Sequence, residues 1–271
     1  MRLGQVSSGE VRQVAVWLGE VWFGMVNFPP RDFLKEIIYH PIFIFLNIGV
    51  FSYSKYNQNK KLFMTLGDTS NKDDWEKKYL FPPIIEDHTQ LILDELGHRG
   101  HTNIFKLRLF NEVFAKELLE LCEGYGRWGE RNWAAYPTND IWLEDIGLGP
   151  IYESFLRLHV YPLIRETWML NNDPWQSMTV ESQTFVAKYD TNNQFHLDLH
   201  HDDSIVTLVV GLNKGFEGGG TYFYNQRSLI NLEIGEAIFH PGGLTHLHGA
   251  RPVTSGTRYT LVSFIKPMFA N

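Results

Sequence analysis

Histidine and aspartate residues gather in one window of the sequence. Six of the eleven histidines lie between His196 and His248, together with Asp198, Asp202 and Asp203. Two imidazoles and one carboxylate form a ligand set that suits Fe(II), and they leave three positions on the metal open for other molecules. The usual arrangement is a His-X-Asp pair where a strand meets a turn, followed by a distant histidine. The window therefore predicts a mononuclear iron site.

Spacing alone does not show which of these residues bind the iron. The window holds three His-X-Asp pairs, which are His196/Asp198, His200/Asp202 and His201/Asp203. If the segment is extended, the even-numbered residues share one face and the odd-numbered residues the other. Alternation disfavours the third pair if the even face points inward, but it cannot separate the first two. The distal histidine is also doubled, as His246 and His248.

Several short stretches around this window match a known family. They are Phe185-Val186-Ala187-Lys188-Tyr189, His200-His201-Asp202, Glu217-Gly218-Gly219-Gly220, His240-Pro241-Gly242-Gly243-Leu244-Thr245-His246-Leu247-His248 and Gly256-Thr257-Arg258-Tyr259. In these stretches the chain resembles the lysyl hydroxylase (procollagen-lysine 5-dioxygenase) branch of the prolyl-4-hydroxylase-type oxygenases. The resemblance is good from about residue 105 to 267 and thin before that.

The resemblance implies a role for each site residue. It assigns iron binding to His200, Asp202 and His248, and binding of the distal carboxylate of 2-oxoglutarate to Arg258. It further implies O2 as the oxidant, ascorbate as a reductant, and succinate and CO2 as co-products. Arginine suits this role because its planar fork contacts a carboxylate through two hydrogen bonds. One departure is Thr221, which stands where the collagen enzymes usually have cysteine.

The spacing of apolar and turn-forming residues along the chain predicts helices first and strands afterwards. Predicted helices cover residues 84–96, 112–125 and 150–169, and predicted strands cover 183–189, 205–212, 221–224, 237–240 and 257–265. This order indicates an α+β domain built on a β-sandwich or barrel. Together with the resemblance, it leads us to expect a double-stranded β-helix (jelly-roll) core with flanking helices over residues 103–271. Residues 1–102 are then a poorly defined N-terminal region, interpreted as a remnant of an upstream domain.

Composition excludes some classes of protein. A net charge of -7 and a pI near 5.9 argue against a nucleic-acid partner. The most apolar stretch runs from Ile37 to Phe51, about 15 residues, and is too short to span a bilayer as a helix. The single cysteine, Cys122, excludes an intrachain disulfide and is expected to be buried. The N-terminus does not have the layout of a secretory signal.

The resemblance implies hydroxylation of a peptidyl side chain, with lysine in collagen-like sequence as the leading substrate. It also implies a homodimer in the endoplasmic reticulum, and the cytoplasm is the alternative compartment because no signal peptide is found. One alternative function is a prolyl or other protein hydroxylase of the same superfamily. Another is an inactive relative that acts as a binding partner or scaffold. For a substrate ammonium group we consider the carboxylates of Asp198, Asp203 and Glu217.

Overall fold

The computed structural model describes residues 4–8, 11–18, 21–28, 72–81, 94–95, 102–129, 138–168 and 180–267. Residues 1–50 form one compact unit and residues 51–271 a second. In the first unit, an antiparallel sheet has the strand order β1-β2-β3, with bounds Gly4–Ser8, Val11–Leu18 and Val21–Phe28. The apolar residues of this region have no clean periodicity, so the sequence predicts no regular element there.

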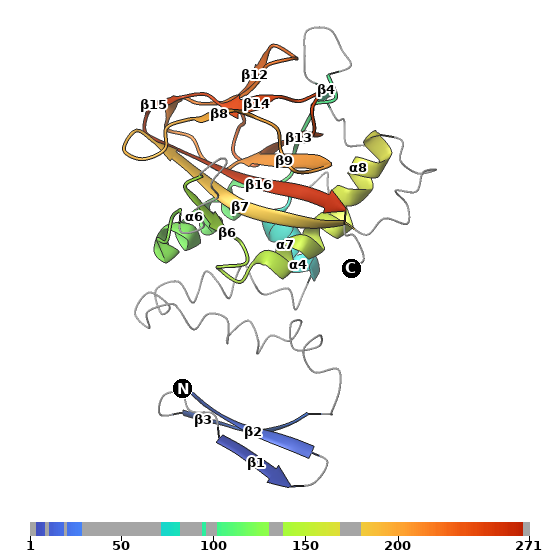
Figure 1. The fold of residues 1–271 in the computed structure, drawn as a ribbon, viewed down its shortest axis with the longest axis vertical. Helices are drawn as coiled ribbons and strands as arrows, with labels where there is room; N and C mark the ends of the chain where they lie inside the picture. Colours follow the sequence, from blue (N-terminus) through green and yellow to red (C-terminus); the bar gives the residue numbers. More distant parts are fainter. Residues whose placement is uncertain are drawn as a thin grey trace. The chain divides into compact units, whose positions relative to one another are not determined.

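The second unit is built on a seven-stranded antiparallel sheet (Figure 1). Its strand order is β4-β5-β13-β9-β16-β7-β6. The long strands β7 (Val180–Asp190) and β16 (Thr257–Pro267) pair along 11 residues. The other strands are β4 (Asp94–Glu95), β5 (Phe105–Arg108), β6 (Asp140–Trp142), β9 (Val206–Gly211) and β13 (Glu236–Pro241).

A four-stranded antiparallel sheet has the order β12-β11-β14-β8. Its strands are β8 (Leu197–His200), β11 (Thr221–Phe223), β12 (Ser228–Ile230) and β14 (His248–Ala250). A separate two-stranded sheet pairs β10 (Glu217–Gly218) with β15 (Val253–Ser255). Between β7 and β16 the chain passes repeatedly from one of the two larger sheets to the other.

The two larger sheets pack face to face, and helices cover the far side of the seven-stranded sheet (Figure 1). A cluster of buried side chains joins the sheets, and its members are Ile104, Val209, Phe223, Ile230 and Ile238. On the helix side, the Ser263 hydroxyl donates to the Tyr152 hydroxyl at 3.4 Å. The seven-stranded sheet is therefore covered on both faces, which explains why all six residues of β9 are buried.

Helix α6 (Glu112–Tyr125) begins and ends where the sequence predicts. Oδ1 of Asn111 accepts hydrogen bonds from the backbone N–H groups of Val113 and Phe114, as an N-cap does. Gly126 follows with a left-handed φ of 68°, and its N–H donates to the carbonyl of Cys122. The spacing of apolar residues predicts Val113 on the buried face with Phe114, Leu118 and Leu121, which is wrong for Val113, since it is 42% exposed. The residues that are buried are Phe114, Ala115, Leu118, Leu121 and Cys122.

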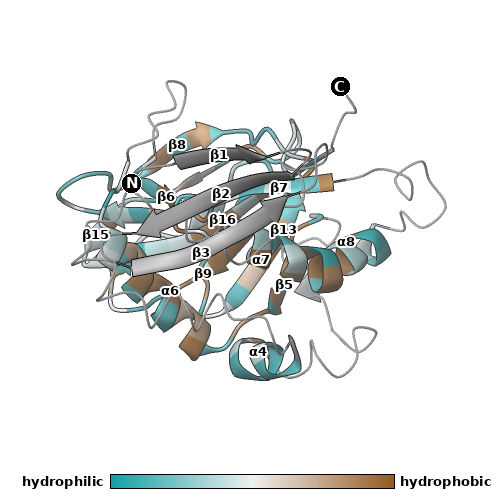
Figure 2. Ribbon diagram, turned by 90° about the horizontal axis from the view of Figure 1, so that it is seen from below, coloured by the Kyte–Doolittle hydropathy of each residue, from teal (hydrophilic) through white to brown (hydrophobic). Residues whose placement is uncertain are grey.

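The predicted helix over residues 150–169 consists of three pieces. These are α7 (Gly149–Phe155), a π-helical turn η2 (Leu156–Val160) and α8 (Tyr161–Thr167). The break precedes Pro162, which has no N–H to continue a regular helix. In η2, Nε2 of His159 lies 2.7 Å from Oε1 of Glu76, on helix α4 (Lys72–Tyr79). Helix α4 is largely hydrophilic (Figure 2) and packs here through Trp75 and Tyr79.

The five strands predicted from the sequence are all present, and the mostly antiparallel sheets with few helices agree with the expected class. The predicted helix over 84–96 falls mainly outside the described residues. Its described part, Asp94–Glu95, is a strand paired with β5, so the prediction is wrong there. The boundary at residue 102 stays a prediction. No helix in the described part of the chain is long and apolar enough to cross a membrane.

We predict that Asn111→Ala lowers the free energy of unfolding by about 1–2 kcal/mol. The substitution removes the N-cap of α6 and also the hydrogen bond from Asn111 Nδ2 to the carbonyl of Lys78 in α4. Urea denaturation measures the change. The control is Val113→Ala, an exposed position in the same turn, for which a change within about 0.5 kcal/mol is expected. Equal effects of the two substitutions would contradict this account of the helix start.

Candidate metal centre

His200 and His248 lie opposite each other on neighbouring strands. His200 is the last residue of β8 and His248 the first of β14, and the two are paired in register. The next pair is Ala250 with Leu197, so β8 has one residue more than β14 between the two pairs. This bulge breaks the simple alternation of side chains. Asp198 is therefore exposed although it stands two residues from the buried His200.

Asp202 lies just after β8, in the turn that leads to β9. Its backbone N–H donates to the carbonyl of Gly242 at 2.9 Å, and the Thr207 hydroxyl donates to its Oδ2 at 2.6 Å. The Ser204 hydroxyl lies 2.7 Å from that of Thr207. A Cβ on Gly242 would overlap Oγ and the carbonyl of Ser204. The turn that carries Asp202 thus packs against a backbone position that only glycine can occupy.

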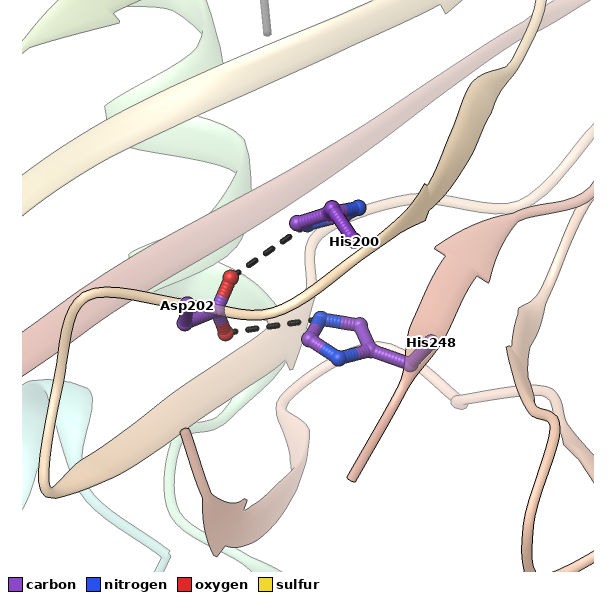
Figure 3. Close-up of side chains that lie close together, drawn as sticks. All are labelled: His200, Asp202 and His248. Carbon is purple, nitrogen blue, oxygen red and sulfur yellow. Dashed lines mark ion pairs between the residues drawn. The ribbon is translucent and has the colours of Figure 1, made fainter. Parts of the chain in front are cut away.

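The three side chains converge on one point (Figure 3). Nε2 of His200 lies 3.3 Å from Oδ1 of Asp202, and Nε2 of His248 lies 3.4 Å from Oδ2. One ligand atom from each residue lies within 4.8 Å of the other two, and all three residues are buried. In the part of the chain that the structure describes, no other group of histidine, cysteine or acidic residues is arranged in this way.

Both histidines present the same ring nitrogen to Asp202. Nδ1 of His200 lies 2.8 Å from the carbonyl of Asp198, and Nδ1 of His248 lies 2.8 Å from the carbonyl of His246. A carbonyl only accepts, so each Nδ1 carries a proton, and in a neutral ring the Nε2 lone pair faces the carboxylate. Lone pairs and anionic oxygens repel one another unless a cation lies between them. The arrangement therefore suits a metal ion.

Burial and charge act in opposite directions on the pKa values of these groups. Burial raises the pKa of Asp202, but a hydrogen bond from His200, when that ring is protonated, and the nearby histidines outweigh burial and hold this pKa well below its usual range. Burial lowers the pKa of His200, but its hydrogen bond to Asp202 and the charge of that carboxylate raise it overall. The pKa of His248 is lowered, mainly by burial. Asp202 is therefore ionised and His248 neutral at pH 7.

The competing His-X-Asp pairs lie outside the cluster. Nε2 of His196 lies 3.3 Å from Asp198, and the side chain of that aspartate is 87% exposed. Nε2 of His201 lies 3.2 Å from the carbonyl of Leu244, and His201 is exposed. The structure thus brings together the second pair and not the first or third.

The remaining two histidines pack beside the cluster. His246 is satisfied at both ring nitrogens, by the carbonyl of Thr102 and the hydroxyl of Thr245, each at 2.8 Å. His240 is fully buried in β13, and its ring centroid lies 4.7 Å from that of His248. Burial lowers the pKa of His240 to about 3, so it stays neutral.

Arg258 extends from β16 into the space between the two sheets and is 5% exposed. Its guanidinium lies 5.4 Å from the ring centroid of Tyr189, and Nη2 lies 3.4 Å from Oγ1 of Thr221. Burial lowers the pKa of Arg258, and the neighbouring Tyr189 opposes this. None of the described residues forms an ion pair with this arginine.

A cavity of about 460 Å³ contains the histidine–aspartate cluster and Arg258. Alternate residues of β16 line it, as in any strand that presents one face to a cavity, and they are Arg258, Thr260, Val262, Phe264 and Lys266. Several lining residues had no role predicted from the sequence, among them Asp140, Tyr189 and Thr207. Tyr189 could have been found, because it ends the strand that pairs with Arg258. The other two carry no recognisable spacing.

Of the three carboxylates considered for a substrate ammonium group, only one lines the cavity. Asp198 and Glu217 are exposed and do not line the cavity. Asp203 does line it, and its Oδ2 accepts a hydrogen bond from Nζ of Lys266 at 2.7 Å.

Residues 180–267 match the profile of the 2OG-Fe(II) oxygenase superfamily. The chain carries a 2OG-Fe(II) oxygenase domain, which is the class that the sheets and the buried cluster define. Over 211 residues it is 32% identical to the multifunctional procollagen lysine hydroxylase and glycosyltransferase of Caenorhabditis elegans. Over 210 residues it is 31% identical to procollagen-lysine,2-oxoglutarate 5-dioxygenase 2 of Mus musculus. The resemblance inferred from the sequence is confirmed.

These alignments cover 73% of this chain but only 28% and 27% of the two relatives. The chain thus spans little more than a quarter of their length. Among solved structures, a viral collagen prolyl hydroxylase from Paramecium bursaria Chlorella virus-1 matches with a TM-score of 0.42 at 20% identity. That match covers 62% of this chain and 97% of the viral one.

We predict that Gly242→Ala destabilises the protein by about 1–3 kcal/mol, because the added methyl overlaps Ser204 in the turn that carries Asp202. Gly243→Ala is a matched control, since a Cβ there has nothing within 4 Å. A change within about 0.5 kcal/mol is expected for the control. Urea denaturation of both variants measures the difference, and indistinguishable midpoints would refute the close packing inferred at Gly242.

Proposed function

We propose that this domain is an Fe(II)- and 2-oxoglutarate-dependent dioxygenase that hydroxylates a peptidyl side chain, with succinate and CO2 as co-products. The observation that carries the proposal is the meeting of His200, Asp202 and His248 in a buried cavity that also contains Arg258. Metal ligands and a carboxylate-binding group are thereby combined in one cavity, and all four side chains are buried.

The donor set fits Fe(II). His200 and His248 would bind the ion through Nε2, since each Nδ1 is engaged by a backbone carbonyl, and Asp202 would bind through a carboxylate oxygen. When bound, Fe(II) supplies the one-electron chemistry with O2 that side chains lack. The Thr207 hydroxyl orients the Asp202 carboxylate through its hydrogen bond to Oδ2.

Arg258 fits the distal carboxylate of 2-oxoglutarate. A buried guanidinium without a protein carboxylate is costly, and an anionic co-substrate would provide the missing partner. The planar fork can make two parallel hydrogen bonds to such a carboxylate. The Thr221 hydroxyl lies beside the guanidinium and could donate a further hydrogen bond to the carboxylate of the co-substrate.

We also infer that the two larger sheets form a double-stranded β-helix over residues 103–271. Strands β7, β9, β13 and β16 lie in one sheet and β8, β11, β12 and β14 in the other, so the chain winds between the sheets as it advances. A jelly-roll sandwich has this connection pattern, and it encloses a cavity between its sheets.

Lysine in collagen-like sequence is the leading substrate, since both curated relatives are named for procollagen lysine. By resemblance we add ascorbate as reductant, a homodimer, and the endoplasmic reticulum as the compartment, with the cytoplasm as the alternative. A prolyl or other protein hydroxylase and an inactive relative acting as a scaffold are the competing functions. Mass spectrometry of lysyl and prolyl peptides after incubation with Fe(II), 2-oxoglutarate and ascorbate separates them by the residue that gains one oxygen.

We predict that His200→Ala lowers succinate release by more than about 100-fold. Loss even of a residue that supports a metal ligand costs about 10–100-fold, and His200 is proposed as a ligand itself. Succinate is measured with Fe(II) and 2-oxoglutarate, with and without peptide. His196→Ala is the control, because His196 belongs to the competing pair and lies outside the cluster. Wild-type protein that releases no succinate with any peptide would support the scaffold function instead.

We predict that Arg258→Lys weakens 2-oxoglutarate binding by about 10–100-fold while Fe(II) binding is retained, because lysine cannot make the two-pronged contact. Titration calorimetry with Mn(II) in place of Fe(II) measures the co-substrate affinity without turnover. Arg251→Lys is the control, since Arg251 is exposed and packs over Tyr222. Unchanged affinity in Arg258→Lys would exclude this arginine as the carboxylate-binding group.

A further inference from the structure

The cavity has an aromatic wall opposite the metal cluster. Trp142 on β6 stacks on Phe185 of β7 with ring centroids 5.6 Å apart, and Phe185 contacts Phe264 of β16 edge-on at 5.4 Å. All three side chains line the cavity. This surface suits a long apolar stem, such as the methylene chain of a lysyl side chain. It does not by itself distinguish lysine from proline.

One carboxylate interrupts the aromatic wall. Asp140 stands two residues before Trp142 on β6, so the two side chains share the face that lines the cavity. Asp140 is 3% exposed, and its Oδ2 accepts a hydrogen bond from the Thr138 hydroxyl, which also lines the cavity. An acidic side chain at this depth is unusual in a protein interior.

The strand register places Asp140 one row of lining residues away from the pair formed by Tyr189 and Arg258. Asp140 pairs with Ala187, and Ala187 pairs with Thr260 on β16, so no bulky side chain stands between Asp140 and Thr260 in this row. The neighbouring Tyr189 is buried, which raises its pKa. The charges of Arg258, Asp202 and Asp140 all act on this pKa as well. Asp140 therefore lies in the same electrostatic neighbourhood as the proposed metal and co-substrate ligands.

We propose that Asp140 binds the ammonium group of a substrate side chain, while the wall formed by Trp142, Phe185 and Phe264 packs against its methylene stem. This inference rests on the proposed function and names the feature that selects lysine. An anchor at the end of a long flexible side chain fixes the carbons next to it relative to the metal. A proline ring in a peptide has no cation to offer Asp140.

The test compares two peptides that differ only at one residue. One contains a single lysine, and the other has norleucine there, which keeps the four side-chain carbons and removes the ammonium group. Binding to protein loaded with Mn(II) and 2-oxoglutarate is measured by calorimetry. Wild-type protein should prefer the lysyl peptide by about 10-fold or more, and Asp140→Asn should lose this preference. Glu217→Gln, an exposed position outside the cavity, should keep it.

Co-substrate binding separates this inference from the proposed function. Absence of Mn(II)-dependent 2-oxoglutarate binding in the wild type contradicts the proposed function. Intact co-substrate binding with no preference for lysine, or with a preference that survives in Asp140→Asn, overturns the role of Asp140. Carbodiimide coupling of the lysyl peptide to wild-type protein, mapped by mass spectrometry, needs no variant to fold. A cross-link at Asp140 is expected, and cross-links at other carboxylates alone would overturn the inference.

Discussion

The structure depends on how the negative charge of Asp202 is offset in a buried cluster, because neutral histidine rings would present their lone pairs to it. The anionic oxygens of Asp202 face the Nε2 atoms of His200 and His248 at 3.3 and 3.4 Å. Neither ring can turn its protonated nitrogen inward, since each Nδ1 is tied to a backbone carbonyl. A proton on His200 relieves part of the repulsion, which is why the pKa of this residue is raised by Asp202 against the effect of burial. A divalent cation would relieve the repulsion, so metal binding and the stability of the folded domain are coupled at this site.

Contacts outside the cluster have to hold these three residues together. Two glycines make the approach possible by having no side chain. A Cβ on Gly249 would lie 2.7 Å from the carbonyl of Leu197, and a Cβ on Gly242 would overlap Ser204. Gly249 lets β14 lie close to β8. In β8, the carbonyl of Asp198 accepts a hydrogen bond from Nδ1 of His200. The rigidity of the site thus comes from the sandwich around it, whose packed sheets set the distance between the strands.

Regular strands could be predicted from the sequence, whereas the strands that carry the metal cluster could not. Strand β16 runs for 11 residues without a bulge, so simple alternation holds along it, and the residues on the face of Arg258 line the cavity. Strand β8 has 4 residues and β14 has 3, too few for periodicity to show, and the bulge between them invalidates parity. Only the resemblance selected His200 over His196. Asp140 had no predicted role, although it lies in a family-like stretch, because a single aspartate in the 3-residue strand β6 has no spacing that signals a function.

Charge balance in the cavity indicates where a substrate could be selected. If the proposed groups bind, a divalent cation and Arg258 together offset Asp202 and the two carboxylates of 2-oxoglutarate. The metal centre is then neutral as a whole, and it neither attracts nor repels a charged substrate at long range. Asp203, at the cavity lining, is already bonded to Lys266. Discrimination between a cationic and a neutral side chain therefore has to come from a group such as Asp140, which lies deep in the cavity and away from the metal ligands in the sequence. The two metal-binding histidines and the substrate-selecting carboxylate would then lie on different sheets, so substitutions in β6 could change substrate specificity without disturbing the histidines on β8 and β14.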